Sequence, residues 1–161
     1  MLHIPPLIIA PHPDKNLRRT ATTILSYVQQ TLSAHNASSV TVVGFSLGAA
    51  LSLLDGVYLR LHLSSSVSVR VIGYGMPRVG NQAFADWVDS HLGGQVTHIN
   101  DREDPIPIFP DRSLGFHHAS VEVHITDSGS WENCPGELFS SLSGVRVPRG
   151  ADESPRRRVA S

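Results

Sequence analysis

The 161 residues predict one α/β domain, with a mostly parallel sheet flanked by helices. Short runs of apolar and β-branched residues alternate with longer segments whose apolar residues recur every three or four positions, the spacing of one helix face. The resulting order of strand, helix, strand, helix and strand is typical of parallel sheets with right-handed crossovers. The length suits a single ordinary domain.

The first predicted helix runs over residues 18–35, where apolar side chains follow steps of three and four. Asn36 can end this helix in the left-handed conformation. Residues 40–43 are an uninterrupted run suited to a strand, which favours a parallel strand covered on both faces. A second helix with one apolar face is predicted from Leu47 to about His62.

The second half of the chain continues the alternation. A strand is predicted over 66–75, then a turn and a helix over 77–94 that Gly93 and Gly94 stop. A third strand over 95–100 precedes a proline-rich loop, and 119–125 is a short last strand. These elements place the domain at 17–134.

The two ends lack such periodicity. Residues 1–16 are proline-rich, so we expect an irregular segment. Residues 135–161 contain few large apolar side chains and much Ser, Pro and Arg, which favours a disordered tail. The three arginines at 156–158 are typical of a solvated tail rather than a binding site.

Composition excludes several classes of protein. The formal net charge of −1 gives no indication of nucleic-acid binding. Cys134 is the only cysteine, so no internal disulfide is possible. No segment is typical of a transmembrane span, and the start lacks the basic region of a secretion signal. The nine histidines show no metal-binding spacing, so we expect no metal and no cofactor.

A serine between two glycines interrupts the alternation at residues 44–48, Gly-Phe-Ser-Leu-Gly. The unit over 40–62 is thus a strand, a tight turn and a helix, which is the context of a nucleophile elbow, G-x-S-x-G. We expect glycine at positions 44 and 48 because larger side chains there would collide with neighbouring elements. Ser46 would be the nucleophile, and the backbone N–H of Leu47 could donate to an oxyanion.

A serine nucleophile needs a base, which in turn needs an orienting carboxylate. Three acids follow the third predicted strand, at the sheet edge where active residues gather: Asp101, Glu103 and Asp104. Asp104 is favoured because the stiff segment Pro-Ile-Pro-Ile-Phe-Pro follows it, and Asp101 is its competitor. Spacing alone equally allows surface or helix-capping acids at this position.

Four segments together resemble the fungal class 3 lipases, a family of α/β-hydrolases. They are SVTVVGFSLGAALSLLDGVYL, YGMPRVGNQAFADWV, THINDREDPIPIFP and GFHHASVEVHI, and the second is far more specific than G-x-S-x-G. The resemblance implies a partial α/β-hydrolase fold and extracellular hydrolysis of triacylglycerols and related esters, at a lipid–water interface and without a cofactor. It also implies a Ser-Asp-His triad with Ser46 as nucleophile and Asp104 as acid.

The sequence departs from the family pattern at both ends, so we interpret it as truncated there. Phe45 stands where the family usually has His, which we expect to change packing only. No upstream segment resembles the family's further strands, lid and second oxyanion donor, so we expect exposed apolar surface where those strands would lie. No histidine follows His124, and Cys134 lacks the family's disulfide partner.

The triad base therefore stays open. His118 is a weak candidate, because its position resembles a structural histidine of the family, and His98, His117 and His124 are favoured as packed or surface residues. Three functions remain: a working lipase or esterase, a non-catalytic lipase-like remnant, and a feruloyl-type esterase on the same scaffold. The oligomeric state and the acyl-chain preference are not indicated.

Overall fold

A computed structural model describes residues 13–119 and 121–134, with side chains from Thr20 onward. Three helices and seven strands occur in these ranges, with two short 3-10 helices in the loops. In chain order they are α1 (Pro13–Ala34), β1 (Ser39–Phe45), α2 (Leu47–His62), β2 (Ser68–Tyr74), β3 (Gly80–Asn81), α3 (Gln82–Leu92), β4 (Val96–Asp101), η1 (Ile106–Ile108), η2 (Arg112–Leu114), β5 (Phe116–His117), β6 (Glu122–Ile125) and β7 (Trp131–Cys134).

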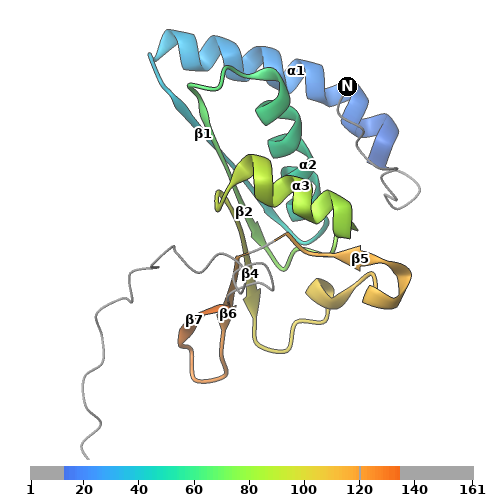
Figure 1. The fold of residues 1–161 in the computed structure, drawn as a ribbon. Coiled ribbons are helices and arrows are strands. Elements are labelled where there is room, and N and C mark those ends of the chain that lie inside the picture. The colour runs from blue at the N-terminus through green and yellow to red at the C-terminus, as the bar shows by residue number, and fades with distance from the viewer. Residues whose placement is uncertain (1–12, 120, 135–161) are drawn as a thin grey trace, which may run out of the picture.

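Five strands form the main sheet, in the order β1-β2-β4-β6-β7 (Figure 1). The pairs β1–β2, β2–β4 and β4–β6 are parallel, and only β7 runs antiparallel to its neighbour. Strands β3 and β5 form a separate antiparallel pair. The mostly parallel sheet flanked by helices agrees with the fold class that the sequence predicts.

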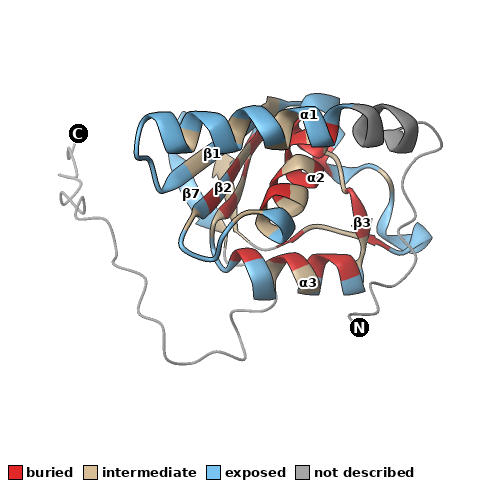
Figure 2. Cartoon of the chain, turned by 90° about the horizontal axis from the view of Figure 1, so that it is seen from above, coloured by how far each residue is buried: buried red, intermediate tan, exposed pale blue. Residues whose placement is uncertain are grey.

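The helices gather on one side of the main sheet, where the buried residues lie (Figure 2). In β2, Val69, Val71 and Gly73 face this side and are buried, whereas the alternate residues are exposed or half-buried. Helix α2 packs its Leu53, Leu54 and Leu59 into the same core. The alternation follows from the strand period of two, which turns successive side chains to opposite faces.

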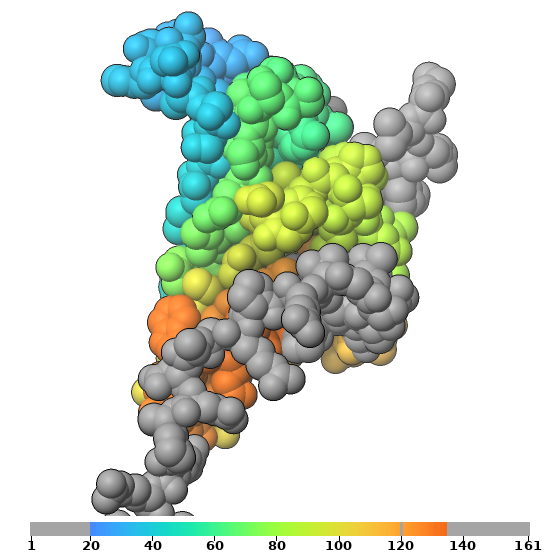
Figure 3. Space-filling view, turned by 60° about the vertical axis from the view of Figure 1, so that its left-hand side comes forward, coloured from blue at the N-terminus to red at the C-terminus, as the bar shows by residue number. Residues whose placement is uncertain are grey.

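Strand β1 differs from its prediction. Its burial alternates between half-buried and exposed residues, and Val43 is 57% exposed. Within the described residues β1 is an edge strand with one covered face, so coverage of both faces was the wrong interpretation of its β-branched run. Figure 3 shows β1 along one margin of the molecule with β2 beside it. Val43, Phe45 and Tyr74 thus provide the exposed apolar surface that the sequence indicates.

The boundaries of other elements also shift. Helix α1 begins at Pro13, so residues 13–16, expected to be irregular, form its first turn. Asn36 takes the left-handed conformation, with φ of 47°, as its place after the helix predicts. Strand β7 was not predicted; it forms a hairpin with β6 in which the Thr126 N–H donates to the Ser130 carbonyl at 2.9 Å. The expectations for 1–12 and 135–161 lie outside the described residues.

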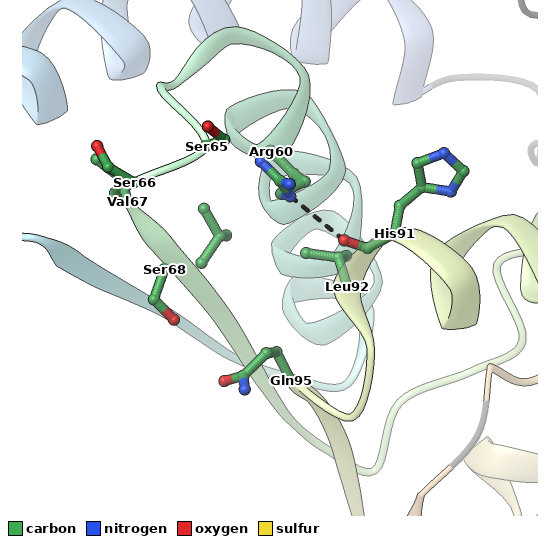
Figure 4. A pocket seen from close by; sticks show the side chains of 9 residues that line it. Arg60, Ser65, Ser66, Val67, Ser68, His91, Leu92 and Gln95 are labelled. Atoms are coloured by element: carbon green, nitrogen blue, oxygen red, sulfur yellow. Dashed lines mark hydrogen bonds between the residues drawn. The ribbon is translucent and has the colours of Figure 1, made fainter.

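A surface hollow lies away from the carboxyl edge of the sheet. A hollow of about 290 Å³ lies near the amino ends of β2 and β4, at the edge of the sheet opposite Ser46 (Figure 4). Across it the Arg60 Nε donates to the His91 carbonyl at 3.3 Å, which ties α2 to α3. None of the described helices has the length and apolar character needed to cross a membrane.

Candidate active site

Ser46 lies between the last residue of β1 and the first residue of α2. Its backbone has φ of 54° and ψ of −125°, outside the usual regions for a residue with a side chain. The Ser46 N–H donates to the Tyr74 carbonyl at 2.9 Å, which fixes the turn to the end of β2. The strand–turn–helix placement predicted for Ser46 is therefore confirmed, and the residue is half-buried.

The two glycines of the elbow differ in how much space a side chain would have. A Cβ at Gly44 would lie 2.2 Å from the Gly48 carbonyl oxygen and 2.4 Å from the Ser52 Oγ, so only glycine fits there. A Cβ at Gly48 would meet nothing within 4 Å. The expected collision is confirmed at Gly44 and wrong at Gly48, whose position in the first turn of α2 faces open space.

The start of α2 places donors beside Ser46. Leu47 is the first helical residue, so its N–H has no acceptor from within the helix. The next turn is closed onto the serine itself, because the Ala49 N–H donates to the Ser46 carbonyl at 2.9 Å. The N-terminal end of a 16-residue helix also favours negative charge at this point. This arrangement can stabilise an oxyanion that forms next to Ser46.

Asp104 lies at the same end of the sheet. Gly75 follows the Tyr74 residue that holds Ser46, and an ideal Cβ on Gly75 would lie 2.7 Å from the Asp104 Oδ2. The other carboxylate oxygen, Oδ1, accepts from the Ile106 N–H at 2.9 Å. Ser46 is therefore bonded to Tyr74, the last residue of β2, and the Asp104 carboxylate lies beside Gly75, the next residue.

Asp101 and Glu103 have different surroundings. Asp101 ends β4, is largely exposed, and its Oδ1 lies 3.8 Å from the Nε of Arg102. Glu103 is exposed as well. Asp104 is half-buried and contacts the end of β2, which is the placement that the sequence analysis favoured over Asp101.

Gly75 offers a test of this placement. We expect Gly75→Ala to shift the Asp104 carboxylate, because the new Cβ would overlap Oδ2 and the residue has φ of +55°, which side chains rarely adopt. The strain adds a cost of about 1 kcal/mol or more in the free energy of unfolding. The NMR amide shift of Ile106, which bonds the same carboxylate, measures the displacement. An unchanged Ile106 shift in a folded variant would contradict the placement.

The candidate base His118 is engaged away from Ser46. Its Nε2 donates to the Pro107 carbonyl at 2.8 Å, and its ring stacks on His98 with centroids 4.5 Å apart. Burial, with His98, Arg78 and Arg112 adding positive charge nearby, lowers the pKa of His118 to about 4. His118 thus has the surroundings of a neutral packed histidine, as its position in the sequence indicated.

The other histidines of this region occupy structural positions. His98 is 3% exposed, its Nε2 donates to the Ala119 carbonyl at 3.2 Å, and burial lowers its pKa. The Nδ1 of His124 lies 3.7 Å from the Oε1 of Glu122, two residues earlier in β6. His117 lies in β5 opposite Gly80 of β3. No set of three or more His, Cys, Asp or Glu suited to a metal ion occurs within residues 13–119 and 121–134.

The lowered pKa of His118 predicts that the fold is less stable in acid. Because the folded state lowers the pKa of His118 to about 4, the unfolded chain binds more protons below about pH 6.5. The free energy of unfolding should therefore fall as pH decreases from about 6.5 to about 4, by up to about 1.4 kcal/mol per pH unit for this group. Urea unfolding at several pH values measures the slope. His118→Asn should flatten it, and an equal slope in both proteins would contradict the assignment.

The segment 76–81, Met-Pro-Arg-Val-Gly-Asn, contains a residue that the sequence analysis did not single out. Arg78 donates from its guanidinium to the carbonyls of Ile108 and Pro110 in the loop that follows Asp104. The signal was present, because a basic residue in the most specific segment of the sequence has a reason to be there. Arg78 cannot act as nucleophile, acid or base, which are the roles that the motifs of the sequence indicate.

The family model for lipase (class 3) matches residues 14–114. The chain belongs to the class 3 lipase family. Both Ser46 and Asp104 fall inside the matched residues, as does Arg78. The resemblance noted in the four sequence segments is thereby confirmed at the level of the family.

Curated relatives of this class 3 lipase chain include secreted fungal enzymes. It is 35% identical over 116 residues to the secreted mono- and diacylglycerol lipase MDL2 of Malassezia globosa, covering 71% of this chain and 38% of the relative. It is 31% identical over 122 residues to the secreted mono- and diacylglycerol lipase LIP2 of Malassezia restricta, covering 74% and 39%. The chain thus spans about two fifths of the length of these relatives.

Solved lipase structures share the fold. Lipase II from Rhizopus niveus superimposes with a TM-score of 0.69 at 31% identity, over 74% of this chain and 46% of that one. A triacylglycerol lipase described as having a serine protease triad at its catalytic centre gives a TM-score of 0.70 at 25% identity, over 80% and 54%. Class 3 lipase membership and the α/β-hydrolase fold therefore rest on sequence and on structure.

Proposed function

We propose that this chain carries the nucleophile and the acid of a serine ester hydrolase of the lipase type. The observation that supports it most is the pairing at the end of β2, where Tyr74 holds the Ser46 backbone and Gly75 contacts the Asp104 carboxylate. Ser46 follows β1 and Asp104 follows β4, on either side of β2, and the nucleophile and acid of the α/β-hydrolases come in this chain order. We propose carboxylic esters of lipids as substrates, since the relatives are named mono- and diacylglycerol lipases.

The proposed reaction has two steps. The Ser46 Oγ attacks the ester carbonyl and loses its proton to a base, and the Leu47 N–H donates to the oxyanion that forms. Collapse expels the alcohol, which takes up a proton, and leaves an acyl group on Ser46. A water molecule then attacks the acyl-enzyme, releases the carboxylic acid and restores the serine.

Asp104 has the role of orienting the base. A carboxylate in this position holds an imidazole in one tautomer and stabilises the imidazolium that forms. Because His118 donates to Pro107 and stacks on His98, we do not assign it as that imidazole. The proposal assigns nucleophile, acid and one oxyanion donor to this chain and leaves the base unassigned.

The surface beside Ser46 suits a lipid substrate. Phe45 and Leu47 flank the serine and are 74% and 65% exposed, and Ile108 and Phe109 of the loop after Asp104 are exposed as well. Apolar side chains in water next to the serine would contact acyl chains favourably. We propose a lipid–water interface as the place of action, outside the cell as for the relatives named secreted.

The engagement of the histidines supports a second candidate, a lipase-like protein that binds lipid esters without turning them over. His98, His118 and His124 each have a partner other than Ser46. The feruloyl-type esterase expected as a third option has no observation in its favour.

A fluorophosphonate probe tests the proposal. We expect it to label the protein more than the Ser46→Ala variant, because an oxyanion site and binding alone retain about a thousand-fold catalysis over water in a serine hydrolase that lacks its base. Ser38→Ala, in the exposed turn before β1, is the matched serine control and should label like the unmodified protein. Equal labelling of the unmodified protein and Ser46→Ala would refute the nucleophile.

A further inference from the structure

The loop that carries Asp104 is short of its own donors. Pro105, Pro107 and Pro110 have no N–H, so few carbonyls of residues 104–110 can be satisfied within the loop. The internal bonds that exist run from Ile108 to the Pro105 carbonyl at 3.3 Å and from Phe109 to the Ile106 carbonyl at 3.1 Å. The later carbonyls must therefore accept from other segments, and those segments fix where the loop lies.

Arg78 supplies most of these donors. Its backbone N–H donates to the Phe109 carbonyl at 2.8 Å, and its Nη1 donates to the Pro110 carbonyl at 2.9 Å and to the Ile108 carbonyl. One residue thus bonds three successive carbonyls. Burial and the charge of Arg112 lower the pKa of the Arg78 guanidinium, with Asp111 opposing the shift.

A second donor completes the row. The His118 Nε2 donates to the Pro107 carbonyl at 2.8 Å, so the four carbonyls from Pro107 to Pro110 each accept a bond from another segment. A carbonyl can only accept, which places the proton of the neutral ring on Nε2.

The segment from Gly75 to Arg78 lies beside both ends of the loop. Gly75 contacts the Asp104 carboxylate at the beginning of the loop, and Arg78 bonds its last three carbonyls. Gly75 is itself fixed to the sheet, because its N–H donates to the Ile99 carbonyl of β4 at 2.8 Å. A displacement of the loop at Arg78 would be transmitted through the stiff prolines to Asp104.

We propose that Arg78 is a positioning residue for the acid of the site: through the carbonyls of residues 108–110 it holds the Asp104 carboxylate against Gly75, on the side of Ser46. The assignment deepens the proposed function and rests on it. Lysine is not equivalent, because a guanidinium offers several donors in a fixed fork whereas an ammonium is a single point of donors.

The first test reads the carboxylate without any activity. In ¹⁵N-labelled protein, the Ile106 amide reports on Asp104, since it donates to Oδ1. Arg78→Met, which keeps the length of the side chain and removes its donors, should move the Ile106 and Gly75 resonances. It should also raise the exchange rate of the Ile106 amide at least about tenfold. Arg78→Lys should give shifts and an exchange rate between those of the unmodified protein and those of Arg78→Met. The control is Arg102→Met, because Arg102 is exposed and pairs with Asp101, and it should leave the Ile106 resonance unchanged.

A purely structural role would give a different pattern. It would lower the urea midpoint and move core resonances such as those of Val71 and Val88, without the graded recovery in Arg78→Lys. If Arg78→Met does not fold, the same measurements on Arg78→Lys decide. An unchanged Ile106 shift and exchange rate in a folded Arg78 variant would overturn the proposal.

The second test separates the loop from the serine. Asp104 acts on the serine through a base, and no base is assigned in this chain, so the rate of fluorophosphonate labelling in Arg78→Met should stay within about tenfold of that of the unmodified protein. A fall to the level of Ser46→Ala in a folded Arg78→Met would show that Arg78 shapes the serine itself and would overturn the role through Asp104. If the unmodified protein labels no more than Ser46→Ala, the proposed function fails, and the Ile106 measurements still decide whether Arg78 sets the carboxylate.

Discussion

Gly44→Ala is expected to destabilise the fold strongly, whereas Gly48→Ala, four residues away in the same motif, is expected to stabilise it. The added Cβ at Gly44 would lie 2.2 Å from a backbone oxygen, and backbone in the first turn of a helix cannot move aside as a flexible side chain can. Overpacking of this kind costs about 3 kcal/mol in the free energy of unfolding.

Gly48 gives the opposite sign. Its Cβ would enter open space, and the residue lies in the first turn of α2, where alanine is favoured over glycine by about 0.5–1 kcal/mol. Urea unfolding followed by circular dichroism measures both midpoints in the same buffer. Equal midpoints, or a lower midpoint for Gly48→Ala than for Gly44→Ala, would show that the geometry of the elbow is not as described.

The second large effect concerns turnover. A protein made of these 161 residues is expected to hydrolyse a short-chain nitrophenyl ester on the order of a million-fold more slowly than a complete serine hydrolase, the effect of removing a triad histidine. The reason is that His98, His118 and His124 are engaged with Ala119, Pro107 and Glu122, and no histidine follows His124 in the sequence. The residual rate should still depend on Ser46.

His118→Ala separates this prediction from its alternative. If His118 acts only through the Pro107 carbonyl, the variant should lose less than about tenfold of the residual rate, through a modest shift of the loop. If it were the base, the unmodified protein would turn over at ordinary lipase rates and His118→Ala would fall to the level of Ser46→Ala. That result would contradict the structural role given to His118.

The sequence predicted the strand–turn–helix at Ser46 well because it depends on local chemistry, and the role of Asp104 as acid stays a prediction. A serine between two glycines, after a β run and before an apolar-faced helix, is typical of a nucleophile elbow. A carboxylate directly before a proline-rich segment is held in place by that stiff backbone. Gly48 was misread because motif arguments treat both glycines alike, whereas each collision depends on which neighbour is present. Arg78 was missed because its role lies in bonds to carbonyls 30 to 32 residues away.

Other differences have the same origin in tertiary structure. The β-branched run of β1 suits a strand with two covered faces, but coverage is decided by which elements lie against it, and in the described residues only one face is covered. Strand β7 has the sequence Trp-Glu-Asn-Cys, which has no alternation of apolar and polar residues. It is a strand because the turn after Thr126 brings it beside β6.

The elbow at Ser46 does not depend on the outer edge of β1. Every bond that shapes Ser46 comes from the inner side: its N–H reaches Tyr74, its carbonyl accepts from Ala49, and Gly44 fits under Gly48. The outer side of β1 contributes none of these contacts, and as an edge strand among residues 13–119 and 121–134 it can accept a further strand. Strand addition there would extend the sheet by β-augmentation and leave the serine as it is. One edge of β1 can thus pair with a further strand while the other edge keeps the backbone of Ser46 in place.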